Sequence, residues 1–169
     1  PPNPPDNTRA VAVIDIGTSS IRMAIAEIGQ QGHIRILDQL QQAVNLGRDC
    51  FTRGGIQRPT IEQCVKVLND FLHILDEYGI HNPADVRVVA TSAVREADNR
   101  MAFLDRIYIA TGLHVVAIEE AEVSRITFLG IRPRLEGVSG VAADRIVCEV
   151  GGGSTAVLLL KSNTVTHSQ

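Results

Sequence analysis

The sequence predicts an α/β fold: one lobe built on a mixed five-stranded sheet with helices on its faces, followed by the first hairpin of a second lobe. Two observations lead to this prediction. Three consecutive strand patterns near the start are followed by alternating helix and strand patterns up to about residue 129. A further hairpin pattern then follows at residues 145–160. The predicted order is β-β-β-α-β-α-β-α and then a β-hairpin.

The chain opens with three strands joined by short turns. Residues 11–14 are an apolar run that predicts a buried strand, and residues 15–20 interrupt it with the letters DIGTSS. Residues 21–28 predict a second strand, and the alternation over residues 33–40 predicts a third. A carboxylate and several hydroxyl groups are therefore expected in a strand-turn-strand unit.

The DIGTSS turn has the residue types of a phosphate and metal site. Asp15 can hold a divalent cation, and Gly17 allows a sharp turn or the close approach of a ligand. Amides and hydroxyls that can point at phosphate oxygens belong to Thr18, Ser19 and Ser20. The same residue types are common in ordinary hairpin turns, so this turn alone does not decide between the two interpretations.

The same chemistry returns near the end of the chain. Residues 145–160 again read as strand, acidic residue, Gly/Ser/Thr turn and strand, with Glu149 as the acidic residue. This pattern is neither a Walker loop nor a dinucleotide fingerprint, because it lacks the lysine and each turn opens a strand rather than a helix. The candidate phosphate contacts in this second turn are Gly151, Gly152, Gly153, Ser154 and Thr155.

The middle of the chain predicts a long loop and then helices alternating with short strands. Residues 41–59 contain few apolar residues and read as a loop, whose Arg48, Arg53 and Arg58 either are solvated or help to hold an anionic substrate. Residues 60–78 give the clearest helix, capped by Thr60 and stopped by Gly79. The remaining elements are a strand over residues 86–90, a helix from Asp98 or Asn99 to Ala110, a strand over residues 113–118 and a helix over residues 119–129.

Two further segments carry candidate functional groups. Arg95 follows the strand that ends at Ala90, and ligands bind at the ends of strands in open α/β sheets. From the residues alone, an ion pair of Arg95 with Glu96 or Asp98 is favoured over phosphate binding. Three glutamates open the helix after residue 118, where acidic residues suit the positive end of the helix dipole: Glu119, Glu120 and Glu122.

Composition narrows the classes of function. The chain has 169 residues, 44% of them hydrophobic and 21% charged, as in an ordinary globular protein. Aromatic residues make up 4% and tryptophan is absent, which disfavours stacking on nucleic acid. The net charge of −3 leaves phosphate binding to local donors and a metal. The three cysteines form no C-x-x-C pair, which favours a reducing, cytoplasmic compartment. Neither a signal peptide nor a run of 18 apolar residues is found, so neither export nor a membrane span is expected.

Five motifs together resemble one family. DIGTSS and EVGGGST are similar to the paired phosphate loops of the actin, hexokinase and Hsp70 superfamily, which has a ribonuclease H-like fold. ATSAVREA, IEEAEVSR and ITFLG narrow the resemblance to the exopolyphosphatase and guanosine pentaphosphate phosphatase family, Ppx/GppA, over roughly residues 10–160. An actin-like lobe is therefore expected. The expected division is a disordered leader (1–8), a lobe (9–131), a crossing (132–144) and the start of a second lobe (145–169).

The resemblance also implies a reaction and roles for residues. Terminal phosphate would be released from inorganic polyphosphate or guanosine pentaphosphate by metal-assisted attack of water. Asp15 and Glu149 would hold Mg²⁺ or another divalent cation, and Arg95 would bind phosphate. Glu122 falls on the family's general base, with Glu120 as the alternative if the alignment shifts. A homodimer is expected for the full-length protein, with neither nucleic acid nor membrane as a partner.

The sequence departs from the family pattern at three positions. Ser19 replaces a common asparagine, Glu149 replaces an aspartate, and Ala156 stands where a glutamate is common. The loss at Ala156 favours a second hypothesis, a catalytically weak phosphate or nucleotide-phosphate sensor. A third, an actin-like kinase or ATPase, is disfavoured by ATSAVREA and the Glu122 helix. Family members are longer than this chain, so an N-terminal fragment with weak or no turnover is expected.

Overall fold

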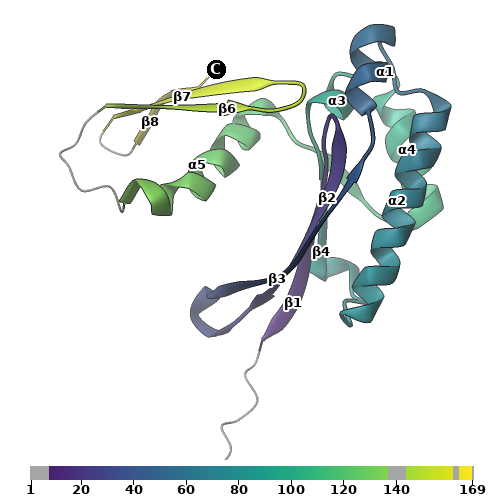
Figure 1. Ribbon diagram of the computed structural model, residues 1–169, viewed down its shortest axis with the longest axis horizontal. Coiled ribbons are helices and arrows are strands. Elements are labelled where there is room, and N and C mark those ends of the chain that lie inside the picture. The colour runs from purple at the N-terminus through teal and green to yellow at the C-terminus, as the bar shows by residue number, and fades with distance from the viewer. Residues whose placement is uncertain (1–7, 137–143, 162–163, 169) are drawn as a thin grey trace, which may run out of the picture. The chain divides into compact units, whose positions relative to one another are not determined.

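The computed structural model of this chain describes residues 8–136, 144–161 and 164–168 (Figure 1). The expected disordered leader therefore lies almost wholly outside the described residues. Contacts between residues divide the chain into two compact units, Pro1–Ala117 and Ile118–Gln169. In the part of the chain that the structure describes, no helix is both long and apolar enough to cross a membrane.

The first unit is built on a mixed five-stranded sheet. Its strands are β1 (Arg9–Ile16), β2 (Ser20–Ile28), β3 (Ile34–Ala43), β4 (Val86–Ala90) and β5 (Val115–Ala117). They lie in the order β3-β2-β1-β4-β5, with antiparallel pairing from β3 to β1 and parallel pairing from β1 to β5. The predicted mixed five-stranded sheet is confirmed.

Helices cover one face of this sheet and form the core with it. They are α1 (Leu46–Arg53), α2 (Arg58–Glu77), α3 (Ser92–Arg95) and α4 (Arg100–Thr111), and short 3₁₀ turns lie at Gln30–Gly32 and Pro83–Asp85. Figure 1 shows α2 and α4 together on one side of the strands. Alternate residues of β1 and β2, such as Ile14, Ile16 and Ile21, are fully buried together with Phe71 of α2 and Phe103 of α4. The buried side chains, every second residue along the strands, therefore pack against the apolar faces of α2 and α4.

The predicted long loop at residues 41–59 is wrong over most of its length. Strand β3 continues to Ala43, helix α1 spans Leu46–Arg53, and helix α2 begins at Arg58. Leu46 and Cys50, one helical turn apart, are buried in the core of the first unit. Gly54 ends α1 in the left-handed conformation, with φ of 77°, a common way for a helix to terminate.

The start of α2 also differs from the prediction. The helix begins at Arg58, two residues before the predicted cap at Thr60, because Pro59 is favoured in the first turn of a helix. The Thr60 hydroxyl instead donates a hydrogen bond to Asp49 of α1. Helix α4 agrees with its prediction, and Gly112 closes it with φ of 71°.

The second unit joins one helix to a three-stranded antiparallel sheet. Its elements are α5 (Glu120–Glu136), β6 (Arg145–Val150), β7 (Thr155–Lys161) and β8 (Thr164–Ser168), with the strand order β6-β7-β8. The predicted hairpin is therefore extended by a third strand. Helix α5 contacts β7 and β8 and continues to Glu136, beyond its predicted end at residue 129. The rest of the predicted crossing falls largely on residues 137–143, outside the described residues, and the lobe boundaries stay predictions.

Candidate functional site

The first glycine turn, residues 17–20, joins β1 to β2. The Gly17 amide donates a hydrogen bond to the carbonyl oxygen of Ser20 at 3.0 Å. A Cβ atom on Gly17 would lie only 3.0 Å from that same oxygen, so a side chain there would open the turn. Asp15 lies two residues before the glycine and opposite Arg22 in the strand register, and its Oδ1 atom is buried. A carboxylate thus lies beside a turn in which there is little room for a side chain at Gly17.

The second glycine turn, residues 151–154, has the same construction. The Gly151 amide donates to the Ser154 carbonyl oxygen at 2.8 Å, and a Cβ atom on Gly151 would lie 3.3 Å from that oxygen. Glu149 lies two residues before this glycine, and both Glu149 and the turn are exposed. The remaining candidate phosphate contacts, Gly152, Gly153 and Thr155, are exposed as well. The two turns thus share the acidic position and the closing hydrogen bond.

The sheet brings the segment with Arg95 beside the first turn. Strands β1 and β4 are parallel, so Ile16 and Ala90 lie opposite each other where the two strands end. The Thr91 amide donates to the Ile16 carbonyl oxygen at 3.3 Å, and the Thr18 and Ser92 hydroxyl oxygens lie 3.0 Å apart. DIGTSS and ATSAVREA, far apart in sequence, are therefore in direct contact where β1 and β4 end.

Arg95 makes the ion pair that the residues alone favoured. It is the last residue of α3, and its Nε donates to Glu96 Oε1 at 3.0 Å. Its side chain is 13% exposed. An arginine held in this way is pre-oriented, and its phosphate-binding role stays a prediction.

The serines of the first turn differ in accessibility. Ser19 is exposed, and its carbonyl oxygen accepts a hydrogen bond from the Val44 amide at 3.1 Å. Ser20 is 3% exposed, and its hydroxyl accepts a hydrogen bond from Gln41 Nε2 at 3.2 Å. The Ser20 hydroxyl therefore links β2 to β3, and a contact of this side chain with phosphate stays a prediction.

The candidate base Glu122 forms a two-pronged pair with Arg125, one turn further along α5. Arg125 Nε donates to one carboxylate oxygen and Nη2 to the other, both at 2.8 Å. These hydrogen bonds, more than the positive charge of the arginine, lower the pKa of Glu122 below its ordinary value of 4.5. The carboxylate is therefore ionised at neutral pH, as a base requires, but its basicity is reduced.

The neighbouring glutamates have simpler surroundings. The Glu119 carbonyl oxygen accepts hydrogen bonds from the amides of Glu122 and Val123, both at 3.0 Å, and so opens the helix. Glu120 is the first residue of α5 and is exposed. Both lie at the positive end of the helix dipole, which accounts for acidic residues there.

Helix α5 also contacts the second acidic position. The Thr127 hydroxyl donates a hydrogen bond to Glu149 Oε2, so one helix carries the candidate base and orients a candidate metal ligand. The sequence did not single out this pair, because it depends on how α5 packs on the sheet. Ser92 was likewise not predicted as a site residue, although polar residues that follow the end of a strand in such sheets often lie near a ligand.

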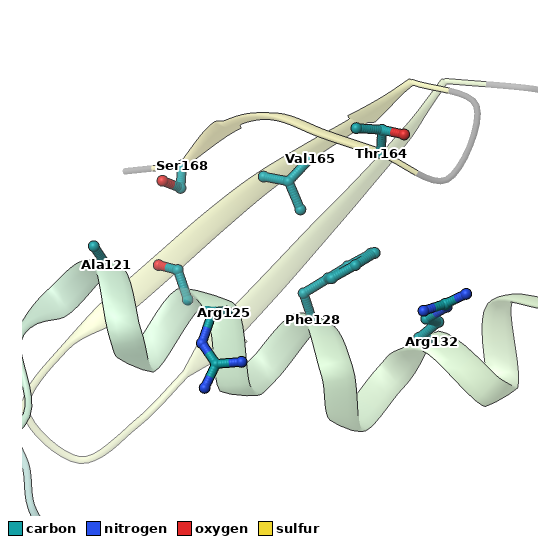
Figure 2. Close-up of a pocket in the computed structure, with 8 residues that line it drawn as sticks. Ala121, Arg125, Phe128, Arg132, Thr164, Val165 and Ser168 are labelled. Carbon is teal, nitrogen blue, oxygen red and sulfur yellow. The ribbon is translucent and has the colours of Figure 1, made fainter.

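A cavity of about 630 Å³ lies on another side of α5, between this helix and β8. Figure 2 shows Phe128 pointing from α5 toward Val165 of β8, while the Arg125 guanidinium group points away from the strand. Apart from Arg125, the partner of Glu122, the lining residues take no part in the contacts described above.

The acidic groups suit a hard cation such as Mg²⁺, which prefers carboxylate oxygens. The buried Asp15 Oδ1 atom beside a glycine turn fits such a ligand. Within the described residues, no group of three or more histidine, cysteine or acidic side chains is placed to hold a metal. Mg²⁺ is commonly bound through one or two carboxylates plus substrate phosphates and water, so the donors present fit this mode.

The mixed sheet and the two matching glycine turns define an actin-like α/β protein. Within that class, residues 24–169 match the Ppx/GppA phosphatase family. The chain belongs to this family.

Relatives and solved structures agree with this assignment. Exopolyphosphatase 2 of Mycobacterium tuberculosis is 33% identical over 157 residues, which cover 88% of this chain and 47% of that protein. The crystal structure of the Aquifex aeolicus Ppx/GppA family member is 30% identical with a TM-score of 0.77, covering 96% of this chain and 50% of that one. An exopolyphosphatase structure from Cytophaga hutchinsonii is 27% identical with a TM-score of 0.82, covering 95% and 49%. The predicted family and actin-like fold are confirmed, and the chain spans about half the length of these relatives.

Proposed function

We propose that the full-length protein is an exopolyphosphatase that releases terminal phosphate from inorganic polyphosphate by metal-assisted attack of water. The observation that carries the proposal is the first glycine turn, which is joined to the Arg95 segment by the Thr18–Ser92 hydroxyl contact of 3.0 Å. Membership of the Ppx/GppA family and the similarity to proteins named exopolyphosphatases support it.

Each residue of the proposed site has one task. Asp15 and Glu149 would hold Mg²⁺, which when bound neutralises phosphate charge and polarises the reacting phosphorus. Amides of the two glycine turns cradle phosphate oxygens, and Arg95 binds one of them through its guanidinium group. Glu122 accepts the proton of the attacking water, while Arg125 fixes the direction of its carboxylate. Catalysis here is mainly positioning and charge neutralisation.

The finer predictions remain part of this proposal. Polyphosphate is preferred over guanosine pentaphosphate as the substrate because the named relatives are exopolyphosphatases. Three predictions made from the sequence are also part of the proposal: a homodimer, a cytoplasmic location, and the lack of nucleic-acid or membrane partners. Because the chain spans about half of its relatives, we expect residues 1–169 alone to show weak or no turnover.

The test is phosphate release by the full-length protein from long-chain polyphosphate, with Mg²⁺ and with a chelator, and from guanosine pentaphosphate in parallel. We expect release from polyphosphate that requires Mg²⁺ and returns when Mg²⁺ is restored. Release that is unaffected by the chelator would contradict the metal-assisted mechanism. Release only from guanosine pentaphosphate would contradict the substrate.

One observation favours the second candidate, a phosphate or nucleotide-phosphate sensor of the same fold. Ala156 lies directly opposite Glu149 in the register of β6 and β7. The carboxylate that is common at that position in the family would therefore stand beside the proposed metal ligand, and here it is missing. Measurable binding of polyphosphate or guanosine pentaphosphate without turnover of either would favour the sensor.

A further inference from the structure

We propose that Gly47 and Ser92 are positioning residues for the first glycine turn: they hold Thr18 from two sides and so fix the turn that binds phosphate. This inference rests on the proposed function and extends it to two residues outside the turn. Neither residue is expected to contact substrate. Their effect is transmitted through Thr18.

The first contact comes from helix α1. The Gly47 amide donates to the Thr18 carbonyl oxygen at 2.8 Å, and the Val44 amide donates to the neighbouring Ser19 carbonyl oxygen at 3.1 Å. Gly47 is buried, and a Cβ atom there would lie 2.2 Å from Thr18 Cγ2. Real Cβ atoms do not approach another atom so closely, so the start of α1 can meet the turn at this distance only through glycine.

The second contact comes from helix α3. The Thr18 hydroxyl oxygen lies 3.0 Å from the hydroxyl oxygen of Ser92, which is 4% exposed. This contact fixes the side-chain rotamer of Thr18, with its oxygen toward Ser92 and its methyl group toward Gly47. The methyl group cannot rotate away from a new Cβ atom without breaking the contact with Ser92.

The far end of α1 is tied to the chain that follows α3. The Asp98 amide donates to the Gly54 carbonyl oxygen at 2.8 Å. The Asn99 side chain accepts from the Ile56 amide at 2.9 Å and donates to the Ile56 carbonyl oxygen at 2.8 Å. Helix α1 therefore contacts the glycine turn at one end and the segment after Arg95 at the other. Displacing α1 at Gly47 would therefore disturb the glycine turn at one end of the helix and the segment that follows Arg95 at the other.

The experiment uses the full-length protein with Gly47→Ala, the double variant Gly47→Ala with Thr18→Ser, and Ser92→Ala. Gly130→Ala is the matched control, because a Cβ atom there meets nothing within 4 Å. Two readouts are needed: steady-state phosphate release from polyphosphate, and amide hydrogen exchange of the peptide that contains residues 17–20. The exchange readout does not depend on catalysis.

We expect Gly47→Ala to speed exchange in the turn and to lower kcat/KM by about 10- to 100-fold, since misplacement of about 1 Å can cost that much. Thr18→Ser removes the methyl group that meets the new Cβ atom, so the double variant should regain most of the lost activity. Ser92→Ala should shift both readouts in the same direction as Gly47→Ala, and Gly130→Ala should change neither.

The outcomes separate the two claims. Unchanged exchange at residues 17–20 in Gly47→Ala and Ser92→Ala would overturn the positioning role, whatever the activity. Faster exchange with unchanged kcat/KM would also overturn it, and so would a double variant no better than Gly47→Ala. If the wild-type protein releases no phosphate, the proposed function fails, while hydrogen exchange still decides whether the turn is held from these two sides.

Discussion

The pairing of Glu122 with Arg125 is central at the scale of single residues. A general base must be ionised, and two hydrogen bonds from one guanidinium group favour the ionised form of Glu122, the proposed base. The same bonds lower the pKa of the carboxylate and hence its strength as a base. Arg125 thus orients the Glu122 carboxylate and favours its ionised form, but makes it a weaker base.

A change in the pH dependence of turnover follows from this pair. Replacing Arg125 by methionine, which has no hydrogen-bond donor, removes the hydrogen bonds that lower the pKa of Glu122, so that pKa should rise. Because the proposed base acts only when ionised, the acidic limb of the kcat profile should move to higher pH in Arg125→Met. Arg125→Lys keeps the charge and should move it less. A limb that stays in place, or that moves to lower pH, would contradict the role of Glu122 as base.

At the scale of elements, helix α1 shows how a short helix is fixed by its ends. Its C-terminal Gly54 has φ of 77°, and a Cβ atom there would lie 2.7 Å from Asp98 Oδ2. Gly79, which follows α2, has φ of 70°, and a Cβ atom there would meet nothing within 4 Å. The two glycines therefore share the backbone conformation but differ in their surroundings.

This difference gives a matched pair of variants. Gly79→Ala should destabilise folding by about 1 to 2 kcal/mol, the usual penalty for a left-handed alanine. Gly54→Ala should cost more, because Asp98 must also move. Urea unfolding of the same chain with each substitution measures both losses. Equal losses would show that the contact with Asp98 does not constrain the end of α1.

Sequence patterns predicted the elements that have strong signals of their own. The five strands of the first unit follow from apolar runs and alternation, and both glycine turns follow from their residue types. Helix α1 was missed because only a few of its residues are apolar, and its stability comes from tertiary contacts at both ends. The Thr127–Glu149 hydrogen bond was missed because no local pattern reports how a helix packs on a sheet.

At the scale of the whole molecule, the two units carry different parts of the proposed chemistry. The first unit supplies Asp15, the first glycine turn and Arg95, whereas the second supplies Glu122, Glu149 and the second turn. Neither unit alone contains the full proposed set of metal ligands, phosphate donors and base. Turnover should therefore require both units within the full-length protein.

The most direct measurement compares Glu122→Gln with Glu120→Gln in the full-length protein, as Mg²⁺-dependent phosphate release from long-chain polyphosphate. Glu120 and Glu122 both lie in the first turn of α5, and each substitution replaces a carboxylate with an amide of nearly the same size. We expect Glu122→Gln to lower kcat by about 100-fold or more, the usual contribution of a general base, and Glu120→Gln to change it by less than about threefold. A large loss in Glu120→Gln with full activity in Glu122→Gln would identify the other glutamate as the base, and full activity in both would contradict general-base catalysis from this helix.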